Sequence, residues 1–254
     1  MSSRSQKFIL GFFLLLCACG ELERSNPLDP QNPRSERRRI VFVEAFVNDT
    51  APFSSFAMIA LDSLAAAFPQ EQVIIVEHHL PSAQYPDAQA LSESADRYKI
   101  LANAGPAVPD VFFNGSGTRA QGASSTSNAL LRYRSAVGAE IDKIAHFTIE
   151  ARKRIAAASL DIEVTIARLG SSAFSQFAVL AIVWEDLKMA GHHHVVRKIL
   201  PPENFSGIQA GEKKSVHMMT SLSGTVNTGQ IQVAVIIEQA TGLGREVLQA
   251  TLAE

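Results

Sequence analysis

Cysteine is nearly absent from this chain. Two of its 254 residues are cysteines, Cys17 and Cys19, and no further cysteine follows them in the sequence. An internal disulfide is therefore excluded beyond residue 19. Thiol–disulfide exchange by that part of the chain is excluded as well, because it needs a sulfur nucleophile. The two cysteines have to be explained by their position close to the N-terminus.

Long hydrophobic runs are also lacking. The apolar run Phe8–Leu16 has nine residues, whereas a membrane-spanning helix needs about 20. Arg4 and Lys7 are the only charged residues before it. A basic start, a short apolar run and then small residues are typical of a secretory signal peptide. They fit that interpretation better than the alternative, a buried core helix, so we expect export.

The end of this run, "LCAC", resembles a bacterial lipobox, in which leucine stands three residues and a small residue one residue before an invariant cysteine. The pattern fits around Cys19, whereas Cys17 is preceded by Leu16, which is too large. The resemblance implies that residues 1–18 are a lipoprotein signal peptide and that acyl chains on Cys19 anchor the protein in a membrane. Gly20 replaces the aspartate of the inner-membrane retention signal, so we expect an outer-membrane lipoprotein of the bacterial cell envelope, facing the periplasm or the surface.

Residues 19–38 contain little that could be buried. The segment Gly20–Arg39 holds three prolines and nine charged residues, which predicts a flexible tether. Loss of Arg4 and Lys7 with the signal peptide would change the formal net charge from −2 to −4. A basic stripe with interleaved aromatic residues is missing, so we expect no binding of nucleic acid.

Residues 39–147 alternate between strand and helix patterns and predict an α/β domain of the order β-α-β-α-β-β-α. The apolar runs Arg39–Val47 and Gln72–Leu80 are typical of buried parallel strands. Between them we expect a helix capped by Asp49 or Thr50, with Pro52 in its first turn. The other expected elements are a helix over 87–105, two short strands joined by an Asn114-Gly115 turn, and a helix over 124–147 capped by Ser125 or Thr126.

This element order resembles the thioredoxin fold, and several stretches resemble the outer membrane protein twenty-eight-like family of thioredoxin-like outer-membrane lipoproteins. The stretches are "VEAF", "VIIVEHH", "AVPDVFFNG", "HHHVVRKIL" and "REVLQA". The chain departs from the fold's redox-active members at the start of the first helix, where their C-x-x-C is replaced by "APFS", residues 51–54. A serine hydroxyl cannot exchange disulfides, so we expect no redox activity and no enzyme.

The resemblance implies that a recognition groove could remain without the chemistry. Val108-Pro109 matches the cis-proline position of thioredoxin-like proteins, where the backbone can pair with an extended peptide. The candidate groove consists of Ala51, Pro52, Phe53, Ser54, Val108 and Pro109. The alternative is that Pro109 only shapes the turn into the next strand.

Residues 148–254 change to alternating strand patterns. In Leu160–Leu169 the apolar residues occupy every second position, as in a strand with one buried face. Similar runs follow at 174–189, 192–200, 215–222, 230–240 and 245–253, separated by turn sequences such as "PPENFSG" and "TGLG". We therefore expect a second, all-β domain with an immunoglobulin-like β-sandwich.

Histidines are the remaining candidates for chemistry. On a strand, His192 and His194 would share one face, and His217 could join them as a third zinc or copper ligand. No carboxylate or cysteine stands at ligand spacing beside them, so we expect neither metal nor cofactor. His78 and His79 end the second predicted strand, and we interpret them as structural. Ser54 and Ser55 lack the nucleophile elbow of hydrolases, and phosphate-binding glycine motifs are missing.

The sequence as a whole favours a membrane-anchored, non-catalytic lipoprotein that binds a protein, a peptide or another envelope component. The alternative is a metal-handling or enzymatic protein that uses the cluster around His192 and His194.

Overall fold

The structure is a computed structural model, and it describes residues 38–105, 107–170, 173–222 and 226–254. The expected signal peptide, Cys19 and the expected tether up to residue 37 lie outside the described residues. Within the described ranges, none of the helices has the length and apolar character that a bilayer span requires.

The first half has the element order predicted from the sequence. Parallel strands β1 and β2 form its centre, and β3 and β4 add antiparallel to the other side of β1. The Val108-Pro109 peptide before β3 is cis, as expected. The elements are β1 (Val41–Val47), α2 (Ser54–Ala67), β2 (Val73–His79), α3 (Ser92–Ala102), β3 (Asp110–Phe113), β4 (Thr118–Gln121) and α4 (Thr126–Glu140).

Both faces of this part of the sheet are covered by helices, which explains its nearly continuous apolar strands. On one face, Val43 and its neighbours pack against α2 and α4 in a single core cluster. On the other face, Phe46 and Phe112 pack against Tyr98 and Leu101 of α3. Every residue of β1 and β2 is buried.

Helix α2 begins later than predicted. It starts at Ser54, and no side chain caps it: the residue before it is Phe53, with φ of 70°. The expected caps Asp49 and Thr50 lie in a turn instead, because the side-chain oxygen of Asn48 accepts hydrogen bonds from the backbone N–H groups that follow it. The cap at the third helix is as predicted, since the Ser125 hydroxyl accepts from the backbone N–H of Asn128.

The second half is built from strands, as expected, and includes two that the sequence patterns did not indicate. One is β5, which begins where the third helix was expected to end. The other is β9, which lies in the predicted turn "PPENFSG". The elements are β5 (Phe147–Ala156), β6 (Ser159–Arg168), β7 (Phe174–Glu185), β8 (Val195–Ile199), β9 (Glu203–Ile208), β10 (Lys213–Ser221), the 3-10 turn η1 (Thr228–Gln230), β11 (Ile231–Thr241) and β12 (Gly244–Leu252).

One sheet runs through both halves, so the expected boundary at residue 147 does not divide the sheet. Its strand order is β12-β11-β7-β8-β2-β1-β3-β4, with β9 also paired to β7. The halves join where β8 pairs in parallel with β2, at Glu77 and Val195. This short pairing covers part of the edge of β2, whose backbone groups would otherwise be unpaired there.

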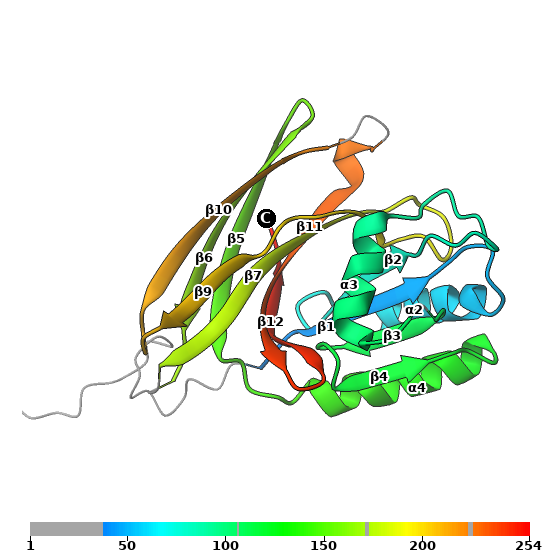
Figure 1. Cartoon of the computed structure of the whole chain (residues 1–254), viewed down its shortest axis with the longest axis horizontal. Coiled ribbons are helices and arrows are strands. Elements are labelled where there is room, and N and C mark those ends of the chain that lie inside the picture. The colour runs from blue at the N-terminus through cyan, green and yellow to red at the C-terminus, as the bar shows by residue number, and fades with distance from the viewer. Residues whose placement is uncertain (1–37, 106, 171–172, 223–225) are drawn as a thin grey trace, which may run out of the picture.

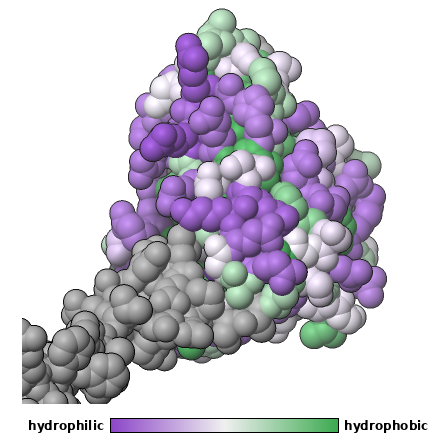
Figure 2. All heavy atoms as spheres, turned by 90° about the vertical axis from the view of Figure 1, so that its left-hand side faces the viewer, coloured by the Kyte–Doolittle hydropathy of each residue, from purple (hydrophilic) through white to green (hydrophobic). Residues whose placement is uncertain are grey.

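A smaller sheet of the order β10-β6-β5 forms a second layer (Figure 1). Its Leu160, Ile162, Val164 and Ile166, the face predicted to be buried, share a core with β7 and β11. Two β layers therefore pack together as in a sandwich, but the larger layer belongs to the first half as well. The outer end of these strands is mostly hydrophilic on the part formed by described residues (Figure 2).

The large sheet curls until β12 meets the start of β1. The backbone N–H of Ile40 donates to the Gln249 side chain, and Gly115 forms an isolated bridge with Glu246. A side chain at Gly115 would lie 2.2 Å from the carbonyl oxygen of Arg245, so this closure requires glycine. Phe42 of β1 thereby joins the same apolar cluster as Val247 of β12.

Candidate functional site

The structure brings both sides of the predicted groove together. Ala51, Pro52 and Phe53 on one side and Val108 on the other line a cavity of about 440 Å³. Ser54 does not line it: its side chain is fully buried, and its hydroxyl accepts a 3.3 Å hydrogen bond from the backbone N–H of Asn48. Pro109 is buried too, and its carbonyl oxygen accepts from Gly122.

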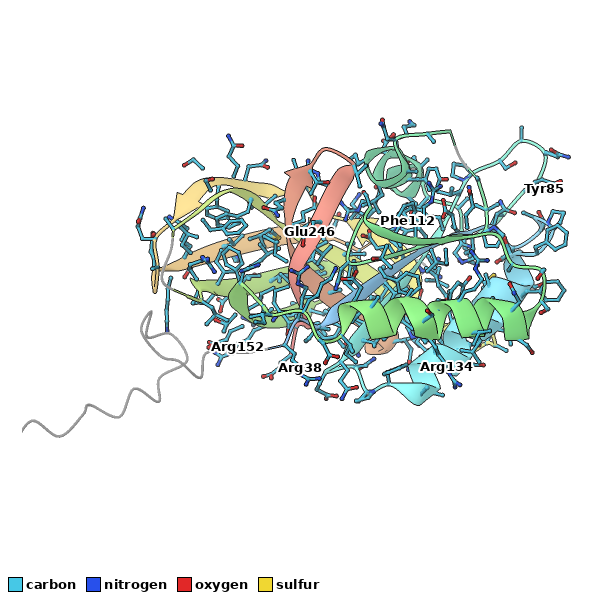
Figure 3. All side chains as sticks on the ribbon, turned by 90° about the horizontal axis from the view of Figure 1, so that it is seen from below. Arg38, Tyr85, Phe112, Arg134, Arg152 and Glu246 are labelled. Atoms are coloured by element: carbon cyan, nitrogen blue, oxygen red, sulfur yellow. The ribbon has the colours of Figure 1, made fainter. Side chains whose placement is uncertain are left out.

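A loop that the sequence analysis missed forms the rest of the cavity wall. It follows β2, and Tyr85 lies at the end of the molecule away from the three-stranded sheet (Figure 3). The proline, serine and glutamine residues of this loop are typical of any connection between two elements. The sequence therefore gives no indication that the loop lines a cavity. The further lining residues are Asn48, Leu80, Pro81, Ser82, Gln84 and Tyr85.

The buried side-chain amide of Asn48 joins residues 50–51 to the loop after β2. Its NH₂ group donates to the carbonyl oxygens of Leu80 and Tyr85 at 2.9 and 2.8 Å, and its oxygen accepts from the N–H groups of Thr50 and Ala51 at 3.1 and 3.0 Å. All of its polar atoms are thereby satisfied, which a buried amide requires. The shape of the cavity is therefore fixed by the protein itself.

An exposed aromatic ring forms the rim of the cavity. Phe53 is 58% exposed, and its ring lies 6.4 Å from that of Phe56, which is 38% exposed. Phe53 also borders a second, shallower depression between β4 and α4, lined by Gln121, Gly122 and Arg132 among others. A large apolar side chain between two depressions is a feature of surfaces that bind other molecules.

Next to the groove, two histidines and two aspartates join the ends of β1 and β2 to the turn before β8. The His79 ring lies 2.8 Å from the Asp87 carboxylate, and the His192 ring lies 2.9 Å from that of Asp49. Burial would raise the pKa of Asp87, but the hydrogen bond with His79 and those from the backbone N–H groups of Asp49 and Gln89 together outweigh burial and lower the pKa. Hydrogen bonds join the members of this group to one another, while Nε2 of His79 has no partner among the described residues.

His192, His194 and His217 do not converge. The first two lie in the turn before β8 rather than on a strand, and each of the three faces a different carboxylate: Asp49, Glu77 and Asp161 respectively. His217 lies on the exposed side of the three-stranded sheet, away from the ends of β1 and β2. The sequence has no carboxylate at ligand spacing beside the histidines, and the carboxylates that they face come from distant segments.

A buried ion cluster lies between α3 and both halves of the sheet. The Arg97 guanidinium contacts Glu44 of β1 through two atoms, at 2.7 and 2.9 Å, and Glu238 of β11 at 2.7 Å. Burial would raise the pKa of Glu44, but Arg97 and a hydrogen bond with His78 outweigh it and lower the pKa to about 2. Burial lowers the pKa of His78, whose ring lies 3.2 Å from the Ser94 hydroxyl.

Two solved structures resemble the chain over most of its length. HBP35 of Porphyromonas gingivalis has a TM-score of 0.63 at 13% identity, over 85% of this chain and 74% of that one. A protein from Agrobacterium tumefaciens has a TM-score of 0.54 at 14% identity, over 85% of this chain and 95% of that one. These two similarities show that the chain shares its fold with both proteins.

A third likeness is more limited. A domain of the outer membrane lipoprotein Omp28 from Porphyromonas gingivalis has a TM-score of 0.35 at 14% identity, over 44% of this chain and 89% of that domain. This similarity is too low to support an argument. No protein-family model matches the chain, and no curated protein matches it by sequence.

Proposed function

We propose that this chain is a non-catalytic lipoprotein of the bacterial cell envelope, anchored at Cys19, that binds an extended protein or peptide segment in the groove between residues 51–53 and Val108. The observation that carries the proposal is the cavity itself, which is preformed by Asn48 and bordered by the exposed Phe53 ring. Sites of this kind combine apolar walls with a few polar groups that fix orientation.

The groove suits recognition better than reaction. Its lining holds no ionisable side chain other than the Tyr85 phenol, which favours an uncharged, partly apolar peptide. The Ser54 hydroxyl, the one group at a redox-active sulfur position that could act as a nucleophile, is buried and hydrogen-bonded to Asn48. Two positions that carry sulfur in active relatives of the fold therefore offer neither a thiolate nor an accessible hydroxyl.

The first test concerns the groove. We expect Phe53→Ala to weaken binding of peptides selected from a random display library about 10- to 30-fold. Truncation of an aromatic side chain that acts as a binding hot spot costs about 2 kcal/mol or more, and about 2 kcal/mol corresponds to a factor of about 30. Phe53 is exposed, so the fold should not change. Leu243→Ala, at another exposed apolar position in the β11–β12 turn, is the control, and equal affinity of both variants would contradict the groove assignment.

The second test concerns the anchor. We expect Cys19→Ser to abolish lipid attachment and to leave the protein unprocessed or soluble, because the acylated residue is lost. Cys17→Ser should leave membrane attachment intact, since that residue departs with the signal peptide. Cell fractionation and mass spectrometry of both variants distinguish the outcomes, and normal lipidation of the Cys19→Ser protein would refute the anchor.

A further inference from the structure

Three ligand-type side chains, two of them buried and that of Asp62 half-buried, meet at the seam between the two halves of the sheet. Asp62 comes from α2, Glu77 from β2 and His194 from the turn that enters β8. One ligand atom of each lies within 4.8 Å of the other two. Glu77 is also the residue through which β2 pairs with β8, and its backbone N–H donates to the His194 carbonyl oxygen at 2.8 Å.

Four buried polar atoms of this group have no hydrogen-bond partner among the described residues. Glu77 is 0% exposed, and neither of its carboxylate oxygens has a hydrogen bond from any described residue. The same holds for Oδ1 of Asp62 and Nδ1 of His194, which is 9% exposed. The Nδ1 atom lies 3.7 Å from Glu77 Oε1, which is too long for a hydrogen bond. Buried polar groups are nearly always paired, so this arrangement requires an explanation.

The two negative charges of the group also lack a compensating cation. Among the described residues, no lysine or arginine forms an ion pair with Asp62 or Glu77. Two adjacent carboxylates with no cation are costly to bury. By contrast, the neighbouring set of Asp49, His79 and Asp87 has similar spacing, but its members already hydrogen-bond to one another.

We propose that Asp62, Glu77 and His194 bind one divalent transition-metal ion, of which zinc is the first to test. One imidazole nitrogen and two carboxylates are ligands that zinc accepts, at about 2.0–2.2 Å. The ion neutralises both carboxylates and satisfies all three orphaned side chains. The backbone N–H of Gly191 donates to Asp62 Oδ2 at 2.6 Å and orients that carboxylate, as outer partners of metal ligands do. The ion thereby fastens α2 and the turn before β8 to the end of β2.

Trp184 provides a direct readout. It is the one tryptophan of the sequence, and its ring centre lies 5.2 Å from that of His194. The experiment uses the full chain with Cys17→Ser and Cys19→Ser, so that thiols cannot bind the metal. We expect one Zn²⁺ per chain by calorimetry and a melting temperature that rises with Zn²⁺ concentration. Co²⁺, a paramagnetic substitute, should quench the Trp184 fluorescence at the same stoichiometry.

Variants locate the ion. Glu77→Gln and His194→Gln should each weaken Zn²⁺ binding at least 100-fold, and Glu77→Gln should melt higher than the parent in the absence of metal, because a buried unpaired charge is removed. If Glu77→Gln does not fold, Asp62→Asn, at a partly exposed position, takes its place. His193→Gln and Asp49→Asn are matched controls and should bind as the parent does. No binding at millimolar Zn²⁺, binding without a Trp184 response, or equal losses in the controls would overturn the proposal.

Discussion

Arg97→Met is expected to lower the free energy of unfolding by about 3–5 kcal/mol, because removal of one partner from a buried ion cluster leaves the others uncompensated. Arg97 is 4% exposed and is the only described basic side chain that contacts both Glu44 and Glu238. Methionine preserves much of the side-chain volume, so the loss reports the charge. Glu44 would be left buried without an arginine partner, and Glu238 would keep only its longer, 3.6 Å contact with Arg245.

Lys99→Met is the matched control on the same helix. The Lys99–Asp96 pair is more than half exposed on both sides, and exposed pairs contribute at most about 1 kcal/mol. Urea unfolding of both variants, with unchanged slopes against denaturant, measures the difference. Equal stability of Arg97→Met and the parent would mean that the cluster does not tie α3 to the two halves of the sheet.

The central strands could be predicted because their signal is local. Each residue of Val41–Val47 and of Val73–His79 is buried, so both strands read as continuous apolar runs whatever surrounds them. The alternation of Leu160, Ile162 and Val164 is equally local, because it follows from one face of a strand meeting the core. The order of these elements and their identity as strands could therefore be predicted from the sequence.

The joining of the two halves could not be predicted from the sequence, because it depends on one pairing between residues far apart in the chain, Glu77 and Val195. Strand β9 was not predicted for a related reason. Only one of its residues is buried, and it is a strand because it hydrogen-bonds to β7, not because of its own pattern. The start of α2 was predicted too early. The side-chain oxygen of Asn48 accepts hydrogen bonds from the backbone N–H groups of Thr50 and Ala51, which holds these residues in a turn before the helix.

The candidate site also has residues that the sequence predicts and residues that it does not. Ala51, Pro52, Phe53 and Val108 were predicted from motif position and do line one cavity. Asn48 and the loop through Tyr85 complete it by contacts that no spacing reveals. The histidine spacing suggested ligands on one strand, whereas the carboxylates that His192, His194 and His217 face come from the loop after β1, from β2 and from β6. Sites assembled from distant segments leave no periodic trace in a sequence.

The last prediction concerns the lost redox site. We expect the native protein to show no insulin reduction at all, because positions 51 and 54 carry alanine and serine. The double variant Ala51→Cys/Ser54→Cys, in a background with Cys17→Ser and Cys19→Ser, should form a disulfide between the introduced thiols. The backbone N–H of Ser54 lies 3.4 Å from the carbonyl oxygen of Ala51. A turn of this kind brings the two Cα atoms within about 7 Å, and disulfides span about 4.4–6.8 Å.

The structure also limits how reactive that pair should be. Because α2 begins at Ser54, a thiolate at position 54 lies in its first turn, where the helix dipole contributes about 0.3–1 kcal/mol, less than one pKa unit. Position 51 precedes the helix and gains less. We therefore expect slow but measurable turnover in the double variant and none in either single variant, with two titratable thiols before oxidation and none after. Turnover by the native protein would refute the non-catalytic proposal, and two thiols that stay free would show that residues 51–54 do not hold the geometry of a redox-active turn.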